Sequence, residues 1–211
     1  MSELAKMTTN AKIILGSSSA ARHAILKEMG FTFTVMSADI DEKAIRRDTA
    51  EDLVMALAEA KAEAIMTKIR VLNDKENDHN GEPVLLITAD QVVVYEGTIR
   101  EKPVDEKEAR GFIKDYSKAP ASTVGSVLII NLTTGKRKGG IDKTEIYFHP
   151  IPDELISSLI EEGEVFYCAG GLMVEHPLVS PFVSAMVGSI DSVMGLPKDL
   201  TLSLIQDVLK E

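Results

Sequence analysis

The spacing of apolar residues changes along this chain, and the changes predict strands that alternate with helices. Apolar runs at 11–16, 31–37 and 84–97 have the length and the β-branched content of strands. Between them, apolar residues recur every three or four positions, which is typical of amphipathic helices. The first half of the chain therefore predicts an α/β arrangement.

Capping residues mark where the first two predicted helices begin and end. Ser17 to Ser19 precede an amphipathic stretch that stops at Gly30, because serine caps helix N-termini and glycine accommodates the turn at a C-terminus. Thr49 and Asp52 form an approximate capping box for a helix that continues to about Arg70. These two helices fit between the three predicted strands.

The second half of the chain predicts a mixture of elements that includes an antiparallel hairpin. The predicted elements are a helix that opens at Asp105, strands at 122–132 and 139–148 joined by the turn "TTGK", a helix over 152–163, a strand around 165–168, an extended stretch near 182–190 and a helix from Lys198. Parallel alternation followed by a hairpin indicates an α/β fold with a mixed sheet.

The strand at 84–97 contains a contradiction. Its sequence, "VLLITADQVVVYEG", places Asp90 and Gln91 inside what should be the most buried strand. An unpaired carboxylate that is buried in a protein costs several kcal/mol. Either Asp90 lies where the strand meets solvent, or a positively charged group lies beside it.

Composition narrows the class of protein. The 211 residues, 45% of them hydrophobic, suffice for one large domain or two small lobes with a core of their own. The single cysteine, Cys168, excludes an internal disulfide and fits a reducing cytosol. The apolar runs are too short to span a bilayer. We expect a flexible tail at 1–10, a single domain over 11–211 and a surface excursion at 73–83.

The net charge argues against nucleic acid as a partner. Lys and Arg number 23 against 33 Asp and Glu, which gives a formal net charge of −10. Such a field repels phosphate backbones. A small phosphate ligand is still compatible with this charge, provided that a few placed cations, helped by a metal ion, bind it locally.

The stretch "GSSSAAR" at 16–22 is the first candidate for chemistry. It places serine hydroxyls and free backbone N–H groups at a predicted helix N-terminus, where an anion is favoured, and Arg22 follows one turn later. Simple N-capping explains the same serines, so the motif by itself is weak evidence for a ligand.

Acidic and basic positions elsewhere complete a candidate anion site. Three carboxylates in the loop 39–42, namely Asp39, Asp41 and Glu42, suit a hard divalent cation, although a solvated loop has the same composition. Lys61 falls on the apolar face of its predicted helix, so its ammonium either snorkels to solvent or reaches an anion. Lys102, before Pro103, has an ordinary surface lysine as its alternative interpretation.

Together these candidate residues describe a phosphate site with a metal ion. We predict that residues 17–22, 39–42 and 90–91 each end a strand, and α/β sheets place their ligands at the carboxyl ends of strands. No P-loop, dinucleotide-binding glycine motif or nucleophile elbow is present in the sequence. The four histidines are scattered, and Cys168 has no visible base partner, so we interpret it as a buried thiol.

Six motifs resemble, in order and spacing, those of the Maf family of nucleotide pyrophosphatases. They are "LGSSSAARHAILKEMG", "SADIDE", "ALAEAKAEAI", "ITADQVVVYEGTIREKP", "YCAGGLMVE" and "VMGLP", and the resemblance covers about residues 12 to 205. It implies a mixed, elongated α/β sheet flanked by helices, with two lobes around a deep nucleotide-binding cleft. Because family members are often dimeric, it also implies a homodimer as one assembly.

The resemblance implies a nucleoside triphosphate pyrophosphatase that releases a nucleoside monophosphate and pyrophosphate with the help of a divalent cation (Mg²⁺, Mn²⁺ or Co²⁺). The family's general base corresponds to Asp90, which together with Glu42 also binds the metal ion. The phosphate-binding residues correspond to Ser17, Ser19, Arg22, Lys61 and Lys102.

The resemblance also bears on the substrate. Gln91 and Glu175, with "CAG" at 168–170, look like the 7-methyl-GTP branch, whereas the dTTP/UTP branch has Thr, Gln and "KAG" at these places. A carboxylate at position 175 would accept hydrogen bonds from guanine and attract its cationic methylated ring. Ala20 and Ala21 depart from the family's Pro plus Arg or Trp, and without the Trp a stacking surface is lost, so a broader specificity is compatible with the sequence.

Two alternatives remain open. One is a dTTP/UTP or modified-pyrimidine pyrophosphatase, and the other is a non-catalytic nucleotide sensor that regulates cell division, since the family takes its name from a septum-formation phenotype. A sensor could dispense with the base and the metal carboxylate, yet both are present. We expect a cytoplasmic enzyme whose partner is a nucleoside triphosphate, with no nucleic acid and no membrane involved.

Overall fold

A computed structural model shows that the chain forms two compact units, and it describes residues 11–73 and 82–210. Unit 1 takes in the described residues up to Asp90, residues 126–141 and those from Met194, and unit 2 takes in residues 91–125 and 142–193. The predicted tail at 1–10 and residues 74–81 of the predicted surface excursion lie outside the described residues. Within the described part, no helix is both long enough and apolar enough to cross a membrane.

Strands and helices alternate along the chain, as the apolar pattern predicts. The elements are β1 (Lys12–Leu15), α2 (Ala20–Glu28), β2 (Phe33–Val35), η1 (Glu42–Ala44), α3 (Ala50–Asn73), β3 (Val84–Tyr95), β4 (Thr98–Arg100), α4 (Glu106–Asp115), β5 (Ala121–Asn131), β6 (Arg137–Phe148), α5 (Asp153–Glu162), η2 (Glu164–Tyr167), η3 (Ala169–Gly171), η4 (Ser180–Phe182), β7 (Val183–Val187), α6 (Ile190–Val193) and α7 (Lys198–Leu209). The α/β class is confirmed.

Among the described residues, seven strands form one mixed sheet, as the sequence predicts. Their order is β2-β1-β3-β5-β6-β7, and β4 pairs with β3. β1 runs parallel to β2 and to β3, whereas β4 is antiparallel to β3 and β7 is antiparallel to β6. β1 pairs with β3 from Val84 to Ile87, and β4 pairs with it from Val93 to Tyr95. Asp90 lies on the stretch of β3 between these two pairings.

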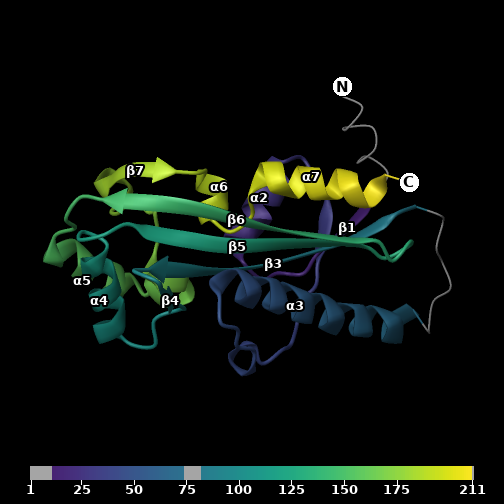
Figure 1. Ribbon diagram of the computed structural model, residues 1–211, viewed down its shortest axis with the longest axis horizontal. Helices are drawn as coiled ribbons and strands as arrows, with labels where there is room; N and C mark the ends of the chain where they lie inside the picture. Colours follow the sequence, from purple (N-terminus) through teal and green to yellow (C-terminus); the bar gives the residue numbers. More distant parts are fainter. Residues whose placement is uncertain (1–10, 74–81, 211) are drawn as a thin grey trace. The chain divides into compact units, whose positions relative to one another are not determined.

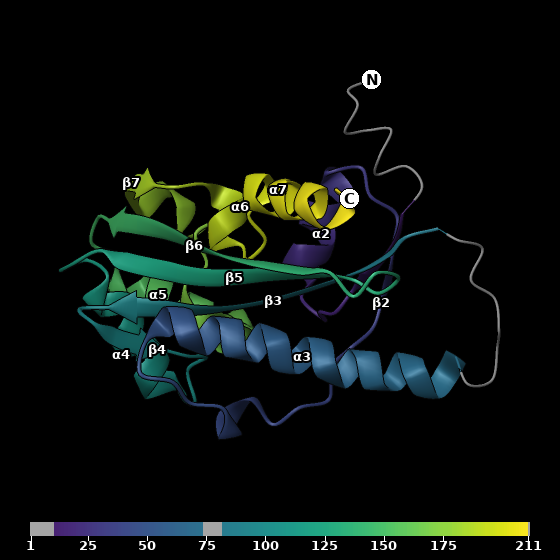
Figure 2. The same cartoon turned by 45° about the vertical axis from the view of Figure 1, so that its right-hand side comes forward.

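In unit 1, helices cover both faces of the sheet. Figures 1 and 2 show α3 on one side of the strands and α2 with α7 on the other. Successive residues of a strand point to opposite faces, so Leu85 and Ile87 pack in the cluster that contains residues of α2 and α7, while Leu86 packs with Ala62 and Ile65 of α3. Each fully buried Leu or Ile contributes about 1.5–3 kcal/mol. This two-sided burial explains the continuous apolar run that predicts β3.

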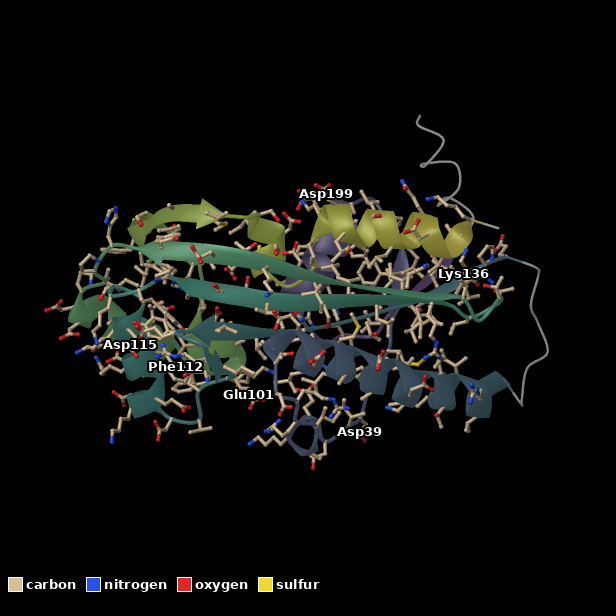
Figure 3. The ribbon with its side chains drawn as sticks, in the orientation of Figure 1. Asp39, Glu101, Phe112, Asp115, Lys136 and Asp199 are labelled. Atoms are coloured by element: carbon tan, nitrogen blue, oxygen red, sulfur yellow. The ribbon has the colours of Figure 1, made fainter. Side chains whose placement is uncertain are left out.

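Unit 2 has a core of its own, which is rich in aromatic rings. The guanidinium of Arg100 lies 4.1 Å from the ring centroid of Tyr95 and 4.5 Å from that of Phe112. Asp115 accepts a hydrogen bond from Arg100 at 2.6 Å, and Figure 3 labels Asp115 and Phe112 close together on α4. The ring of Tyr116 packs against that of Tyr95 at 5.8 Å. This cluster binds the β3–β4 hairpin to α4.

The predicted caps form as the residue types suggest. Asp52 N–H donates to Thr49 Oγ1 at 3.1 Å, so the approximate capping box at the start of α3 is confirmed. Asp105 Oδ1 accepts the N–H of Glu108 at 2.8 Å and caps α4. Gly163 ends α5 with a φ of 81°, a left-handed conformation that glycine adopts without strain.

The strand predicted around 165–168 is wrong, because this segment forms the 3₁₀ helix η2. Phe166 N–H donates to the carbonyl of Gly163, and Cys168 N–H donates to that of Val165. Four mostly apolar residues are too few to show whether their period is that of a strand or of a helix. The extended stretch predicted near 182–190 is confirmed over β7 and ends where α6 begins.

Candidate active site

Asp90, the predicted general base, lies in the middle of β3. The prediction that residues 90–91 end a strand is wrong, because β3 continues through them to Tyr95. Of the two alternatives for this carboxylate, the positively charged neighbour is present: Lys61 Nζ lies 3.0 Å from Asp90 Oδ1. The side chains of Lys61 and Asp90 are only 12% and 13% exposed. Each therefore offsets a desolvation cost that the other would suffer alone.

Lys61 also binds a second carboxylate, from the acidic loop. Its Nζ lies 2.9 Å from Oε1 of Glu42, whose side chain is 49% exposed. The other two loop carboxylates have different positions: Asp41 accepts the N–H of Lys43 and caps η1, and Asp39 is exposed on the loop before it (Figure 3). Of the three predicted cation ligands in this loop, Glu42 is the one that joins Lys61.

Two buried hydroxyl groups hold α3 against the strands of unit 1. Thr88 Oγ1 donates to the carbonyl of Ala58 at 2.9 Å, and Ser126 Oγ donates to the carbonyl of Val54 at 2.7 Å. The backbone N–H of Asp90 in turn donates to Ser126 Oγ at 3.4 Å. These carbonyls lie on the face of α3 that also carries the lysine bound to Asp90. The hydroxyls therefore fix the point from which that lysine side chain extends.

Arg22 brings a second cation to the same part of unit 1. Its Nη1 donates to the carbonyl of Ala89 at 3.0 Å and to Oγ of Ser17 at 3.4 Å. Burial lowers the pKa of Arg22 from its usual value, and the negative charges of Asp90 and Glu42 act in the opposite direction. The structure thus brings together five of the predicted residues, namely Ser17, Arg22, Glu42, Lys61 and Asp90.

The serine turn before α2 is ordered by its own hydrogen bonds. Ser19 Oγ accepts the N–H of Arg22 at 3.4 Å, so the N-capping interpretation is confirmed for this serine. Ser17 is buried, its Oγ accepts the N–H of Ser19 at 3.2 Å, and its carbonyl accepts a hydrogen bond from His23 Nε2 at 2.7 Å. Ala21, a predicted specificity position, lies in the first turn of α2.

Glu42 and Asp90 fit a divalent metal ion that completes its coordination with substrate oxygens. In the described part of the chain, no group of three or more His, Cys, Asp or Glu side chains could hold a metal ion alone. Mg²⁺ commonly uses one or two carboxylates together with water and substrate phosphates. Here two carboxylates already converge on one cationic group, the ammonium of Lys61. The donor set suits a hard ion that arrives with a polyphosphate.

The predicted residues of unit 2 form a second group. Lys102 and Glu175 are exposed, and neither has an ion-pair partner among the residues that the structure describes. Burial raises the pKa of Cys168 to about 11; Glu175 and Glu164 act in the same direction, and Lys102 acts against them. These charged groups are therefore electrostatic neighbours of the thiol. A thiol with this pKa is protonated at neutral pH, which supports its interpretation as an inert side chain.

A glycine bend connects the segment of Lys102 to that of Cys168. Gly170 N–H donates to the carbonyl of Glu101 at 2.8 Å, and the hydroxyl of Tyr116 donates to the carbonyl of Gly170 at 2.6 Å. Gly170 has a φ of +62°, and a Cβ at this position would lie 2.5 Å from the Tyr116 hydroxyl oxygen. The bend therefore requires glycine.

Gln91, a predicted specificity residue, uses its amide nitrogen within unit 2. The nitrogen donates to the carbonyls of Ser192 at 3.3 Å and Val193 at 2.9 Å, at the end of α6. The position of this side chain is set by the protein rather than by a substrate.

Several polar side chains that hold these groups in place were missed by the sequence reasoning. Thr88 and Ser126 each put one hydroxyl into an aliphatic run, and such an interruption is a signal that could have been read. Tyr116 is expected from the sequence only as part of an apolar helix face. Its bond to Gly170, 54 residues away in the chain, leaves no local signal.

Comparison with known proteins gives one consistent result over nearly the whole chain. A family model described as "Maf-like protein" matches residues 12–208. A 7-methyl-GTP pyrophosphatase of Dictyostelium discoideum is 40% identical over 95% of this chain and 98% of the relative. A dTTP/UTP pyrophosphatase of Pelotomaculum thermopropionicum is 29% identical over 95% and 96% of the two chains. A 7-methyl-GTP pyrophosphatase of Vibrio vulnificus is 26% identical over 89% and 90%.

Proposed function

The chain belongs to the Maf-like family, and from this premise we propose that it is a nucleoside triphosphate pyrophosphatase with 7-methyl-GTP as its preferred substrate. It hydrolyses the bond between the α- and β-phosphates and releases a nucleoside monophosphate and pyrophosphate. The observation that carries the proposal is the convergence of Glu42 and Asp90 on Lys61, with Arg22 nearby. This arrangement combines a base, a pair of metal-binding carboxylates and cations for phosphate oxygens.

In the proposed reaction, Asp90 is the general base. Its carboxylate takes a proton from a water molecule whose oxygen attacks the α-phosphorus. As that bond forms, the bond from the α-phosphorus to the bridging oxygen breaks, and pyrophosphate leaves with the electron pair. Before metal ion and nucleotide bind, Lys61 orients the carboxylate through the contact at 3.0 Å to Oδ1, which leaves the other oxygen, Oδ2, to meet the water.

Cationic and hydroxyl groups bind the triphosphate in this proposal. Arg22 and Ser17 act at the N-terminus of α2, where backbone N–H groups also favour an anion, and Ser19 caps that helix. Lys61 and Lys102 neutralise charge that develops on the phosphate oxygens. A divalent metal ion (Mg²⁺, Mn²⁺ or Co²⁺), bound by Glu42 and Asp90, would supply Lewis-acid polarisation of these oxygens when present.

Recognition of the nucleobase is assigned mainly to unit 2. Glu175 accepts hydrogen bonds from the guanine edge, and its charge attracts the methylated, cationic ring. Its exposure leaves the carboxylate accessible to a ligand. Gln91, also in unit 2, and Ala21, on α2 in unit 1, complete the proposed specificity positions.

The test measures pyrophosphate release from 7-methyl-GTP, GTP, dTTP, UTP and pseudo-UTP with each of the three metal ions. We expect kcat/KM for 7-methyl-GTP to exceed that for dTTP by at least about tenfold. The paired N–H donors of guanine find an acceptor in Glu175, and thymine does not offer this pair of donors. Glu175→Gln should lower the 7-methyl-GTP value by about tenfold and leave dTTP nearly unchanged. Glu164→Gln, which removes an exposed charge from the same neighbourhood of Cys168, is the matched control.

Two results would replace this proposal. Preferred turnover of dTTP or UTP would identify a pyrimidine nucleotide pyrophosphatase, a function favoured by the relative of that name. Nucleotide that binds without turnover at saturating metal would identify a non-catalytic sensor, such as a regulator of cell division. We further propose that residues 11–211 act as one functional domain on free nucleotides in the cytoplasm, as a monomer or as a homodimer.

A further inference from the structure

The ammonium of Lys61 lies where the two candidate metal ligands meet. Its Nζ is 2.9 Å from Glu42 Oε1 and 3.0 Å from Asp90 Oδ1, so one cation contacts both carboxylates at hydrogen-bond distance. A divalent ion that contacted these same two oxygens from the side of Lys61 would lie close to the position of Nζ. Two cations do not share such a position, because both charge and size exclude it.

The side chain of Lys61 also has little freedom to move away from the two carboxylates. Its side chain is 12% exposed, and α3 is fixed two turns before it by the bond from Ser126 to the Val54 carbonyl and one turn before it by the bond from Thr88 to the Ala58 carbonyl. An ammonium in such a place is stable only while it has a counter-charge. If it loses both carboxylates, it needs another anion within reach.

We propose that Lys61 is a built-in counter-ion that occupies the metal position of the nucleotide-free protein. A divalent cation then binds tightly only when a triphosphate replaces the two carboxylates as the partner of the ammonium. The inference rests on the proposed function, because it assumes that Glu42 and Asp90 are metal ligands. It assigns Lys61 a second task besides binding phosphate: it keeps two carboxylates together and charge-compensated between turnovers.

A consequence is that metal ion and nucleotide bind with positive coupling. Without nucleotide, the metal ion must separate Lys61 from two carboxylates and leave it without a counter-charge. With nucleotide, a phosphate oxygen becomes the counter-charge of the ammonium, so Lys61 is not left unpaired when the metal ion takes the two carboxylates. Each ligand therefore raises the affinity for the other by the same factor.

The experiment titrates Mn²⁺ into the nucleotide-free protein and follows free Mn²⁺ by electron paramagnetic resonance. Lys61→Met removes the competing charge and keeps much of the apolar stem, and we expect it to bind Mn²⁺ at least about tenfold more tightly than the wild type. Lys61→Arg keeps a cation that can contact both carboxylates, so its affinity should stay near the wild-type value.

Lys68→Met is the matched control. Lys68 lies on the same helix, is exposed and donates to the carbonyl of Ser37 at 3.0 Å, in the segment that leads to the acidic loop. Its removal changes the net charge equally, and screening should limit the effect on Mn²⁺ affinity to about twofold. Should Lys61→Met fail to fold, Lys61→Gln, which has no charge and keeps a hydrogen-bonding amide, is measured in its place with the same expectation.

Equal affinities of the Lys61→Met and Lys68→Met proteins would overturn the inference, because a simple change of net charge would then explain both. Weaker Mn²⁺ binding by Lys61→Met would overturn it as well, since Lys61 would then organise the metal site rather than compete for it. Binding by Lys61→Arg as tight as that by Lys61→Met would also overturn it, because the positive charge would then not be what excludes the metal ion. None of these outcomes depends on turnover, so they leave the pyrophosphatase assay of the wild type as a separate test of the proposed function.

Discussion

The predicted site residues of the two units differ in how their charges are paired. In unit 1, Lys61 contacts Glu42 at 2.9 Å and Asp90 at 3.0 Å, and Arg22 is bonded to a carbonyl and a hydroxyl. In unit 2, Lys102 and Glu175 are exposed and have no ion-pair partner in the part of the chain that the structure describes. The predicted site residues of unit 1 are thus paired within the protein, whereas Lys102 and Glu175 of unit 2 face solvent, although unit 2 has ion pairs elsewhere, such as Arg100 with Asp115.

The difference separates two tasks. Catalytic groups must be held in place before the substrate arrives, and fixed partners reduce the reorganisation that the reaction requires. Recognition groups gain more from a ligand when no internal partner has to be displaced first. On this view unit 1 provides the proposed general base and metal carboxylates, and unit 2 provides Glu175 and Gln91 for the nucleobase and Lys102 for the phosphates. The three predictions that follow test this division, beginning with the change that should matter most.

Asp90→Asn should have the largest effect. The amide cannot accept a proton from the attacking water, so we expect kcat to fall by about 10²–10⁴-fold while KM changes little. Steady-state pyrophosphate release measures both constants. A rate within a few-fold of wild type would remove Asp90 as the base. Thermal unfolding of the variant is the control, because Lys61 keeps Glu42 as a partner and the fold should persist.

Lys102→Gln should have an intermediate effect, confined mainly to binding. The loss of one charge-assisted contact to phosphate should raise KM about tenfold, with a smaller fall in kcat. Lys107→Gln, an exposed lysine on α4 of the same unit, is the matched control and should stay near wild type. If both variants raise KM equally, Lys102 acts through net charge alone, and unit 2 loses its assigned contact with the phosphates.

Tyr116→Phe should have the smallest effect, and it tests how unit 2 holds its recognition segment. Burial raises the pKa of Tyr116 to about 12, so its hydroxyl is protonated at working pH and donates to Gly170. Its loss leaves a carbonyl without a donor, which costs about 1–3 kcal/mol of stability. It should also raise KM a few-fold, since Gly170 is bonded to the residue before Lys102.

The control for that variant is Tyr95→Phe. Tyr95 belongs to the same aromatic cluster, but its hydroxyl donates to the carbonyl of Asp115 on α4 at 2.9 Å and does not contact the glycine bend. It should lose comparable stability in thermal unfolding without the change in KM. If both variants change KM alike, the bond from Tyr116 to Gly170 has no particular role in positioning Lys102.

The local elements of this fold could be read from the sequence because their signals are local. Thr49 and Asp52 cap α3, Asp105 caps α4, and Gly163 ends α5, each through bonds to residues within four positions. The segment at 164–167 was misread because four mostly apolar residues fit a strand as well as one turn of helix.

The candidate site could be predicted only in part. The cost of burying a carboxylate left two alternatives for Asp90, contact with solvent or a neighbouring cation, and the position of Lys61 on an apolar helix face made it a candidate for the second, which is the one present. That Lys61 bridges Glu42 and Asp90 could not be read, because it depends on how α3 and the acidic loop pack on β3. The end of β3 was misplaced for the same reason: once its charge is compensated, a carboxylate no longer interrupts a strand.

The protonated state of Cys168 has a bearing on how this protein survives oxidants. Peroxides attack the thiolate form of cysteine, and with a pKa of about 11 only about one thiol in ten thousand is ionised at neutral pH. Burial is the main cause of this raised pKa, with smaller contributions from Glu175 and Glu164, so the surroundings of the thiol protect it from sulfenic acid formation. A protein with no other cysteine is then expected to keep its activity under oxidative stress that inactivates enzymes with exposed, low-pKa thiols.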